Sequence, residues 1–122
     1  MHRMMANCGA VIPTRLDGRF RPITLITPVF AANRERALGI GSVDPTQPDA
    51  AAELRRAVER WGLQGVKLSP PYQGFHPHSD EAYAVYRTAA DLGIFMMFHQ
   101  ASVFVPNGFH EFASPSLLDK VA

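Results

Sequence analysis

The sequence has a single cysteine and no long hydrophobic run. Cys8 has no partner for an internal disulfide, which suits a reducing compartment, and we expect the protein in the cytoplasm. No apolar run approaches the roughly 20 residues that a membrane helix needs, so we expect no membrane partner. The first eight residues are too weakly apolar for a signal peptide.

The sequence also lacks a strong net charge, although its charges are unevenly spread. The formal net charge of the 122 residues is +1. Residues 1–36 hold six arginines and two acids, whereas residues 37–122 hold six basic residues and nine acids. Neither an aromatic platform nor a binding motif accompanies Arg15, Arg19 and Arg21. We therefore expect a solvated basic arm and no nucleic-acid partner.

Residues 1–36 form a poorly defined N-terminal segment, to which we assign no function. Pro22–Phe30 is β-branched and apolar enough for a strand, but Pro28 interrupts it, which favours an edge strand or an irregular loop. Met4 to Val11 is compatible with a short helix.

A regular pattern begins at Leu38, where three apolar strands alternate with three helices. We predict strands over residues 38–43, 65–69 and 94–99. The helical faces are spaced at three and four residues: Leu54, Ala57, Val58 and Trp61; Ala82, Val85, Tyr86 and Ala89; Leu117, Leu118 and Val121. This alternation predicts an α/β fold with parallel strands and right-handed βαβ units.

The expected ends of the helices come from capping residues. Thr46, with Asp49 in capping-box spacing, is expected to start the first helix, and Ser79 and Ser114 the next two. Gly62 and Gly93 are expected to end the first and second. The last helix has room for about two turns, fewer than usual, so we expect the chain to be a piece of something longer.

His99 is the first candidate for chemistry. The preceding run Ile94–Phe98 is wholly apolar, which predicts a strand buried on both faces. In parallel sheets the carboxyl ends of the strands carry the functional residues. A histidine at that position is a candidate metal ligand or general base, and the alternative is a core histidine hydrogen-bonded to a neighbour.

Lys67 lies within the second predicted strand, where burying an unpaired lysine is costly. We consider a cation in a substrate pocket, a Schiff-base lysine, and a structural lysine that snorkels out or pairs with an acid. We favour the pocket cation or the structural lysine over the covalent role.

His76 and His78 have metal-like spacing but lie in a loop, so we interpret them as residues near the mouth of a site. Aromatic side chains in this loop and the next either wall an apolar pocket or pack the loops onto the domain: Tyr72, Phe75, Phe104 and Phe109.

Several short motifs occur in order between Gly41 and Ala122. They are Ser-Val-Asp-Pro at residues 42–45, Gly-Val-Lys-Leu at 65–68, Pro-Pro-Tyr-Gln-Gly-Phe at 70–75, Leu-Gly-Ile at 92–94 and Phe-His at 98–99. Together they resemble the amidohydrolase-related, metal-dependent hydrolases of the aminocarboxymuconate-semialdehyde decarboxylase and γ-resorcylate decarboxylase type. Residues 1–36 match poorly, so we treat residues 37–122 as a partial domain of this family.

The resemblance implies a (β/α)₈ TIM barrel, of which this chain holds about three βα units, the third to the fifth strands. Such barrels need roughly 250 residues. In the family, the histidine at the end of the fifth strand binds one divalent metal, usually zinc, and that role falls on His99. Lys67 matches a fourth-strand lysine near the active site. With Lys67, the pocket candidates are Ser69, Tyr72, His76, His78 and Gln100.

The family's other ligands cannot be placed in this sequence. They are a His-x-His pair on the first strand, a histidine on the sixth and an aspartate on the eighth, which neither Asp44 nor Asp119 matches. A catalytic zinc takes three protein ligands. We therefore expect this chain alone to be inactive, and we leave open whether it binds a metal at all.

The resemblance implies hydrolysis or non-oxidative decarboxylation of a small carboxylate or cyclic substrate at one metal. A second hypothesis is a truncated, non-catalytic barrel that associates with copies of itself through its open sheet edges. A third is a Schiff-base lyase that uses Lys67.

Overall fold

A computed structural model describes residues 35–36 and 38–121. The strand and helix expected before Ala31, and the arginines of the basic arm, lie outside these residues. The elements in chain order are β1 (Ile40–Gly41), α2 (Ala50–Trp61), β2 (Gly65–Leu68), α3 (Pro70–Gln73), α4 (Asp80–Asp91), β3 (Phe95–Phe98) and the 3₁₀ turns η3 (His110–Phe112) and η4 (Pro115–Leu118).

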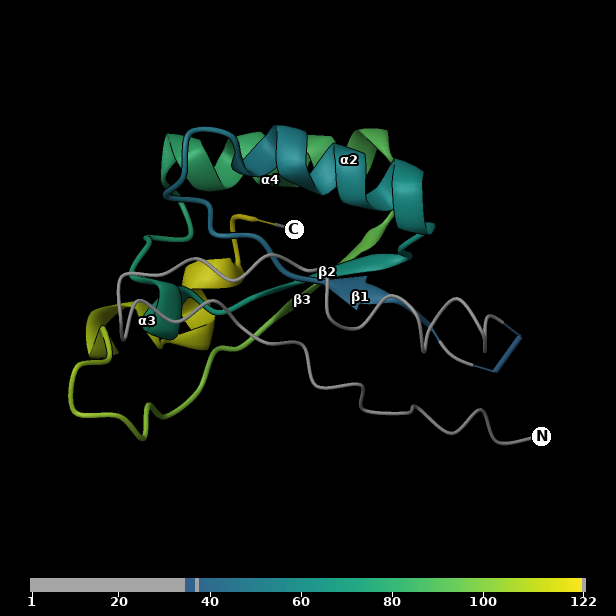
Figure 1. The fold of residues 1–122 in the computed structure, drawn as a ribbon. Helices are drawn as coiled ribbons and strands as arrows, with labels where there is room; N and C mark the ends of the chain where they lie inside the picture. The colour runs from purple at the N-terminus through teal and green to yellow at the C-terminus, as the bar shows by residue number, and fades with distance from the viewer. Residues whose placement is uncertain (1–34, 37, 122) are drawn as a thin grey trace.

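The strands form a parallel sheet in the order β1-β2-β3. Helices α2 and α4 lie side by side over one face of this sheet (Figure 1). The predicted α/β fold, with its alternation of parallel strands and helices, is therefore confirmed. Gly65 pairs with Phe95, and Lys67 pairs with Met97. In a parallel sheet such partners share a face, so the register fixes which side chains lie together.

The hydrophobic core lies between the sheet and the two helices. Its buried members come from the sheet, from the two helices and from the segments that join them: Val43, Ala50, Leu54, Val66, Leu68, Phe75, Ala82, Val85, Tyr86 and Ala89. Along β2, Val66 and Leu68 are in this core and Lys67 is not, as the alternation of a strand requires.

The expectation that β3 is buried on both faces is wrong. Met96 and Phe98 pack against the core, whereas Phe95 is 41% exposed and Met97 is 36% exposed. Helices α2 and α4 cover the face that Met96 and Phe98 share, and alternation turns Phe95 and Met97 to the other face. An apolar run predicts a strand but does not show which of its faces is covered.

The start of α2 also differs from the expectation. The helix begins at Ala50, after Asp49, and not after Thr46. The carboxylate of Asp44 accepts hydrogen bonds from the backbone N–H of Thr46 at 3.0 Å and from its hydroxyl at 2.8 Å. Thr46 is therefore held in an Asx turn, a local arrangement that competes with helix capping.

The other helix boundaries follow the sequence more closely. Ser79 caps α4, and its Oγ accepts from the N–H of Ala82 at 3.3 Å. Gly62 ends α2 in the left-handed conformation, with φ at 64°. Strand β2 ends at Leu68, and the short helix α3 begins at Pro70, so Tyr72 lies in a helix and not in the loop expected there. The last predicted helix is only the 3₁₀ turn η4 after Ser114.

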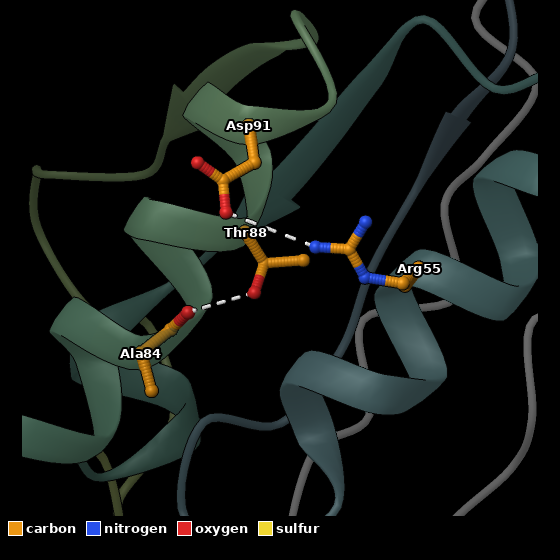
Figure 2. A network of polar contacts seen from close by, with 4 residues as sticks. All are labelled: Arg55, Ala84, Thr88 and Asp91. Carbon is orange, nitrogen blue, oxygen red and sulfur yellow. Dashed lines mark hydrogen bonds and ion pairs between the residues drawn. The ribbon is translucent and has the colours of Figure 1, made fainter.

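A polar contact joins the outer sides of α2 and α4 (Figure 2). Arg55 Nη2 lies 3.8 Å from Asp91 Oδ2, and one turn earlier on α4 the hydroxyl of Thr88 donates to the carbonyl oxygen of Ala84 at 3.0 Å. The ion pair is exposed, so we assign the packing of the helices to the core and not to this pair. No helix among the described residues is long and apolar enough to cross a membrane.

Candidate functional site

The carboxyl ends of β2 and β3 lie side by side. The backbone N–H of His99 donates to the carbonyl oxygen of Leu68 at 2.9 Å, which extends the ladder one step beyond β3. Continuing the register of β2 and β3 sets Ser69 beside His99. The structure therefore places His99 at the end of a parallel strand, as the sequence predicts.

The imidazole of His99 is only partly satisfied by its surroundings. Its Nε2 is buried and has no hydrogen-bond partner among the described residues. The edge of the ring meets the ring of Tyr72, with 5.1 Å between the centroids and 65° between the planes. The alternative that His99 is a core histidine hydrogen-bonded to a neighbour is therefore not seen at its Nε2. A buried nitrogen without a partner needs an explanation, and a bound ligand is one.

Lys67 is half-buried within β2, on the face away from the helices. Burial lowers the pKa of its ammonium group. The ion pairs found in the described part of the chain join Arg55 to Asp91 and Arg56 to Glu53, and neither involves Lys67. The pairing with an acid that we considered for this lysine is therefore not seen.

His76 and His78 make contacts that organise their loop. His76 Nδ1 accepts from the backbone N–H of His78 at 3.0 Å. His78 Nε2 lies 2.7 Å from the carbonyl oxygen of Leu117, so that nitrogen donates and offers no lone pair to a metal. Over residues 35–36 and 38–121, no group of three or more His, Cys, Asp or Glu side chains is arranged to hold a metal ion.

Three further polar atoms are buried without a partner in the described structure: Ser42 Oγ, Ser69 Oγ and Gln100 Oε1. Ser69 and Gln100 are predicted pocket residues, and both lie near the carboxyl ends of the strands. Gln100 Nε2 donates to the carbonyl oxygen of Ser114 at 3.0 Å, so in this side chain only Oε1 lacks a hydrogen-bond partner. Ser42 follows β1 directly and was not among the predicted pocket residues, because its place within the strand predicted over residues 38–43 gave no sign that its hydroxyl would lack a partner.

Gln73 is a second residue that the sequence reasoning missed. Its side chain is fully buried. Oε1 accepts from the N–H of Ser69 at 2.6 Å, and Nε2 donates to the carbonyl oxygen of Val43 at 2.7 Å. This amide links the ends of β1 and β2. A glutamine between Pro-Pro-Tyr and Gly-Phe was the available signal, because a polar side chain in so apolar a stretch needs buried partners.

The aromatic side chains divide between the two roles considered. Phe75 belongs to the core, and Phe109 stacks on Phe112 at a centroid distance of 5.9 Å, so these two pack the loops. Phe104 is 87% exposed. The hydroxyl of Tyr72 accepts from the backbone N–H of Phe104 at 3.4 Å, so Tyr72 contacts both His99 and this loop.

Comparison with known proteins gives one finding. A model of the amidohydrolase family matches residues 25–121, a range that contains every strand-end residue described above. No curated protein and no solved structure matches the chain.

Proposed function

The chain belongs to the amidohydrolase family, and we propose that it forms part of a hydrolase site at which His99 binds one divalent metal, with zinc as the expected ion. The observation that carries this proposal is the buried Nε2 of His99, which the described residues leave without a hydrogen-bond partner. Neutral imidazole is a common metal ligand, and this nitrogen lies at the strand end where parallel α/β folds place their chemistry.

The fold supports this assignment. Three parallel strands with helices over one face correspond to part of the (β/α)₈ barrel expected for the family. A catalytic zinc takes three protein ligands, and the described residues offer His99 alone in a suitable position. The remaining ligands would therefore come from outside residues 35–36 and 38–121.

The residues around His99 suit a small polar substrate. When bound, the metal supplies Lewis-acid polarisation of a carbonyl oxygen. The ring of Tyr72 packs against the imidazole and restricts its orientation. Ser69 and Gln100 each offer a buried oxygen without a partner, and Lys67 offers a cation. We propose hydrolysis or non-oxidative decarboxylation of a small carboxylate or cyclic substrate, carried out in the cytoplasm.

Metal content tests the proposal. The purified protein would be loaded with zinc, desalted and analysed by mass spectrometry for zinc per chain. We expect His99→Ala to retain less zinc and to bind it at least about tenfold more weakly, because loss of even a partner that only orients a metal ligand costs on that order. The matched control is His110→Ala, an exposed histidine that is not among the pocket candidates. Zinc retained equally by the wild type and by His99→Ala would rule out His99 as a ligand, and a wild type that retains no zinc would contradict a metal site in this chain.

A second candidate function is self-association without catalysis. In the described sheet β3 is an edge strand, and it carries the exposed side chains of Phe95 and Met97. Open edges with apolar side chains favour pairing with another copy. Light scattering after size exclusion would show a dimer or larger species that Met97→Lys disrupts. A monomer at all concentrations would exclude this candidate.

A further inference from the structure

Continued one residue beyond β1 and β2, the alternation of the strands sets Ser42, Lys67 and Ser69 on one face of the sheet. Val43 is in the core under the helices, so the preceding Ser42 turns to the opposite side. Leu68 is also in the core, so Lys67 and Ser69, which flank it, turn to that opposite side as well. The register of β1 against β2 pairs Gly41 with Val66, and one step further sets Ser42 next to Lys67.

Among the described residues, no acid forms an ion pair with Lys67. Met97 is paired with Lys67 by register, and the next pair along the same face is Gly65 with Phe95, so these neighbours carry no acid. Asp44 lies just after β1, but it makes no ion pair with Lys67, and its oxygens accept hydrogen bonds from Thr46 and Gln47. A half-buried ammonium without a partner costs folding free energy, which a bound anion would offset.

The two serines supply hydroxyl groups that the fold does not use. Ser42 is 4% exposed, Ser69 is fully buried, and neither Oγ has a hydrogen-bond partner in the described structure. Ser69 stands at the position before α3 where a serine commonly caps, yet its side chain makes no capping bond. Oε1 of Gln73 accepts a hydrogen bond from the backbone N–H of Ser69, and it makes none with the hydroxyl of Ser69.

We propose that Ser42, Lys67 and Ser69 form a subsite that binds the carboxylate of the substrate. A single cation flanked by two hydroxyl donors matches one negative charge spread over two oxygens, and charge-assisted bonds of this kind are strong. A phosphate, with up to two charges, would be undercompensated by one lysine. The subsite deepens the proposed function and rests on it, because His99 identifies this end of the sheet as the substrate side.

Binding of benzoate, compared with neutral benzamide, tests the subsite. Calorimetry would be performed on the purified protein with zinc and again after treatment with a chelator. We expect benzoate to bind more tightly than benzamide in both states. Lys67→Gln should weaken benzoate binding roughly tenfold or more, the loss of a charged hydrogen bond. Ser42→Ala and Ser69→Ala should each give a smaller loss, and Lys120→Gln, an exposed lysine, none.

A second measurement covers the case in which Lys67→Gln fails to fold. Lys67 and Lys120 are the two lysines of the sequence, so reductive methylation with ¹³C-formaldehyde gives one resolvable signal for each. Methylation keeps the positive charge. Benzoate should shift the signal of Lys67 and leave that of Lys120 in place.

Equal binding of benzoate and benzamide, unchanged benzoate affinity in Lys67→Gln, or an unmoved Lys67 signal would each overturn the subsite. These outcomes are separate from a failure of the metal assignment. If His99→Ala kept its zinc while Lys67→Gln lost benzoate, the metal ligand would be wrong and the anion subsite would stand.

Discussion

Gln73 Nε2 donates a hydrogen bond of 2.7 Å to the carbonyl oxygen of Val43, 30 residues earlier in the chain. Oε1 of the same amide accepts from the N–H of Ser69 at 2.6 Å. The backbone pairing of β1 with β2 ends at Gly41 and Val66. The side chain of Gln73 therefore links the two chain segments just beyond the last backbone pair of β1 and β2. It fixes the spacing of the two strand ends that carry Ser42 and Ser69.

Replacement of Gln73 should be costly. Gln73→Met keeps the approximate volume but leaves a buried carbonyl and a buried N–H without partners, so we expect a loss of about 2–4 kcal/mol in the free energy of unfolding. Urea unfolding followed by circular dichroism measures this loss. Gln47→Met is the control, because Gln47 makes longer, partly buried bonds of 3.3 and 3.4 Å. A loss for Gln73→Met no larger than for Gln47→Met would contradict the bridging role.

Tyr86 and Tyr83 should differ in their contribution to stability. The buried hydroxyl of Tyr86 donates to the carbonyl oxygen of Pro77 at 3.0 Å, whereas that of Tyr83 makes an exposed bond of 3.3 Å to Lys120. Tyr86→Phe should cost about 1–2 kcal/mol and Tyr83→Phe less, because only the first leaves a buried carbonyl unpaired. Equal losses in the two variants would refute this distinction.

The stability of the protein should fall at alkaline pH through Tyr86. Burial, with a smaller effect of Tyr83, raises the pKa of Tyr86 above its ordinary value of 10.0. Above that pH the unfolded chain releases a proton that the folded chain keeps, so the stabilisation present below pH 10.0 is lost as the pH rises. Unfolding free energies at pH 8 to 11 should decline less steeply in Tyr86→Phe. Parallel curves for the two proteins would exclude this effect.

Gly74 and Gly93 form a matched pair for testing the packing of the loop after α3. Both have positive φ, 71° and 64°, so alanine is strained at either position. A Cβ at Gly74 would come within 2.6 Å of the ring of Phe109, whereas a Cβ at Gly93 would meet nothing within 4 Å.

Gly93→Ala should therefore cost about 1 kcal/mol from backbone strain alone. Gly74→Ala should cost more, because the ring of Phe109 must also move away from α3. Thermal unfolding of the two variants measures the difference. If Gly74→Ala were no less stable than Gly93→Ala, the contact with Phe109 would contribute nothing.

Local signals along the chain predicted much of this fold. Strand β2 and helix α4 lie within a residue of their expected bounds, because Gly65, Ser79 and the periodic apolar residues all act locally. The end of α2 at Gly62 is local in the same way. The start of α2 was misplaced because Thr46 donates hydrogen bonds to the carboxylate of Asp44 instead of capping the helix. The sequence alone does not show which of these two roles a threonine takes.

The site was predictable only in part, because it depends on contacts between distant segments. The strand-end position of His99 followed from its apolar run. The loop contacts of His78 depend on Leu117, 39 residues away, and the bridge made by Gln73 depends on Val43. The exposure of Phe95 depends on which face the helices cover. No periodicity in the sequence encodes such pairings.

Lys67 should lower the stability of the protein at neutral pH, a cost that fits a residue kept for binding. Burial lowers the pKa of its ammonium below the ordinary 10.5. Between the folded pKa and 10.5 the unfolded chain holds the extra proton, so the stability of the wild type should rise with pH across that window.

Lys67→Met should therefore be more stable than the wild type at pH 7, with the advantage shrinking towards pH 10. Urea unfolding at several pH values measures this, with Lys120→Met as the exposed control. Lower stability of Lys67→Met at pH 7 would mean that the ammonium has a partner in the folded protein, and the lysine would then not be free to bind a substrate anion.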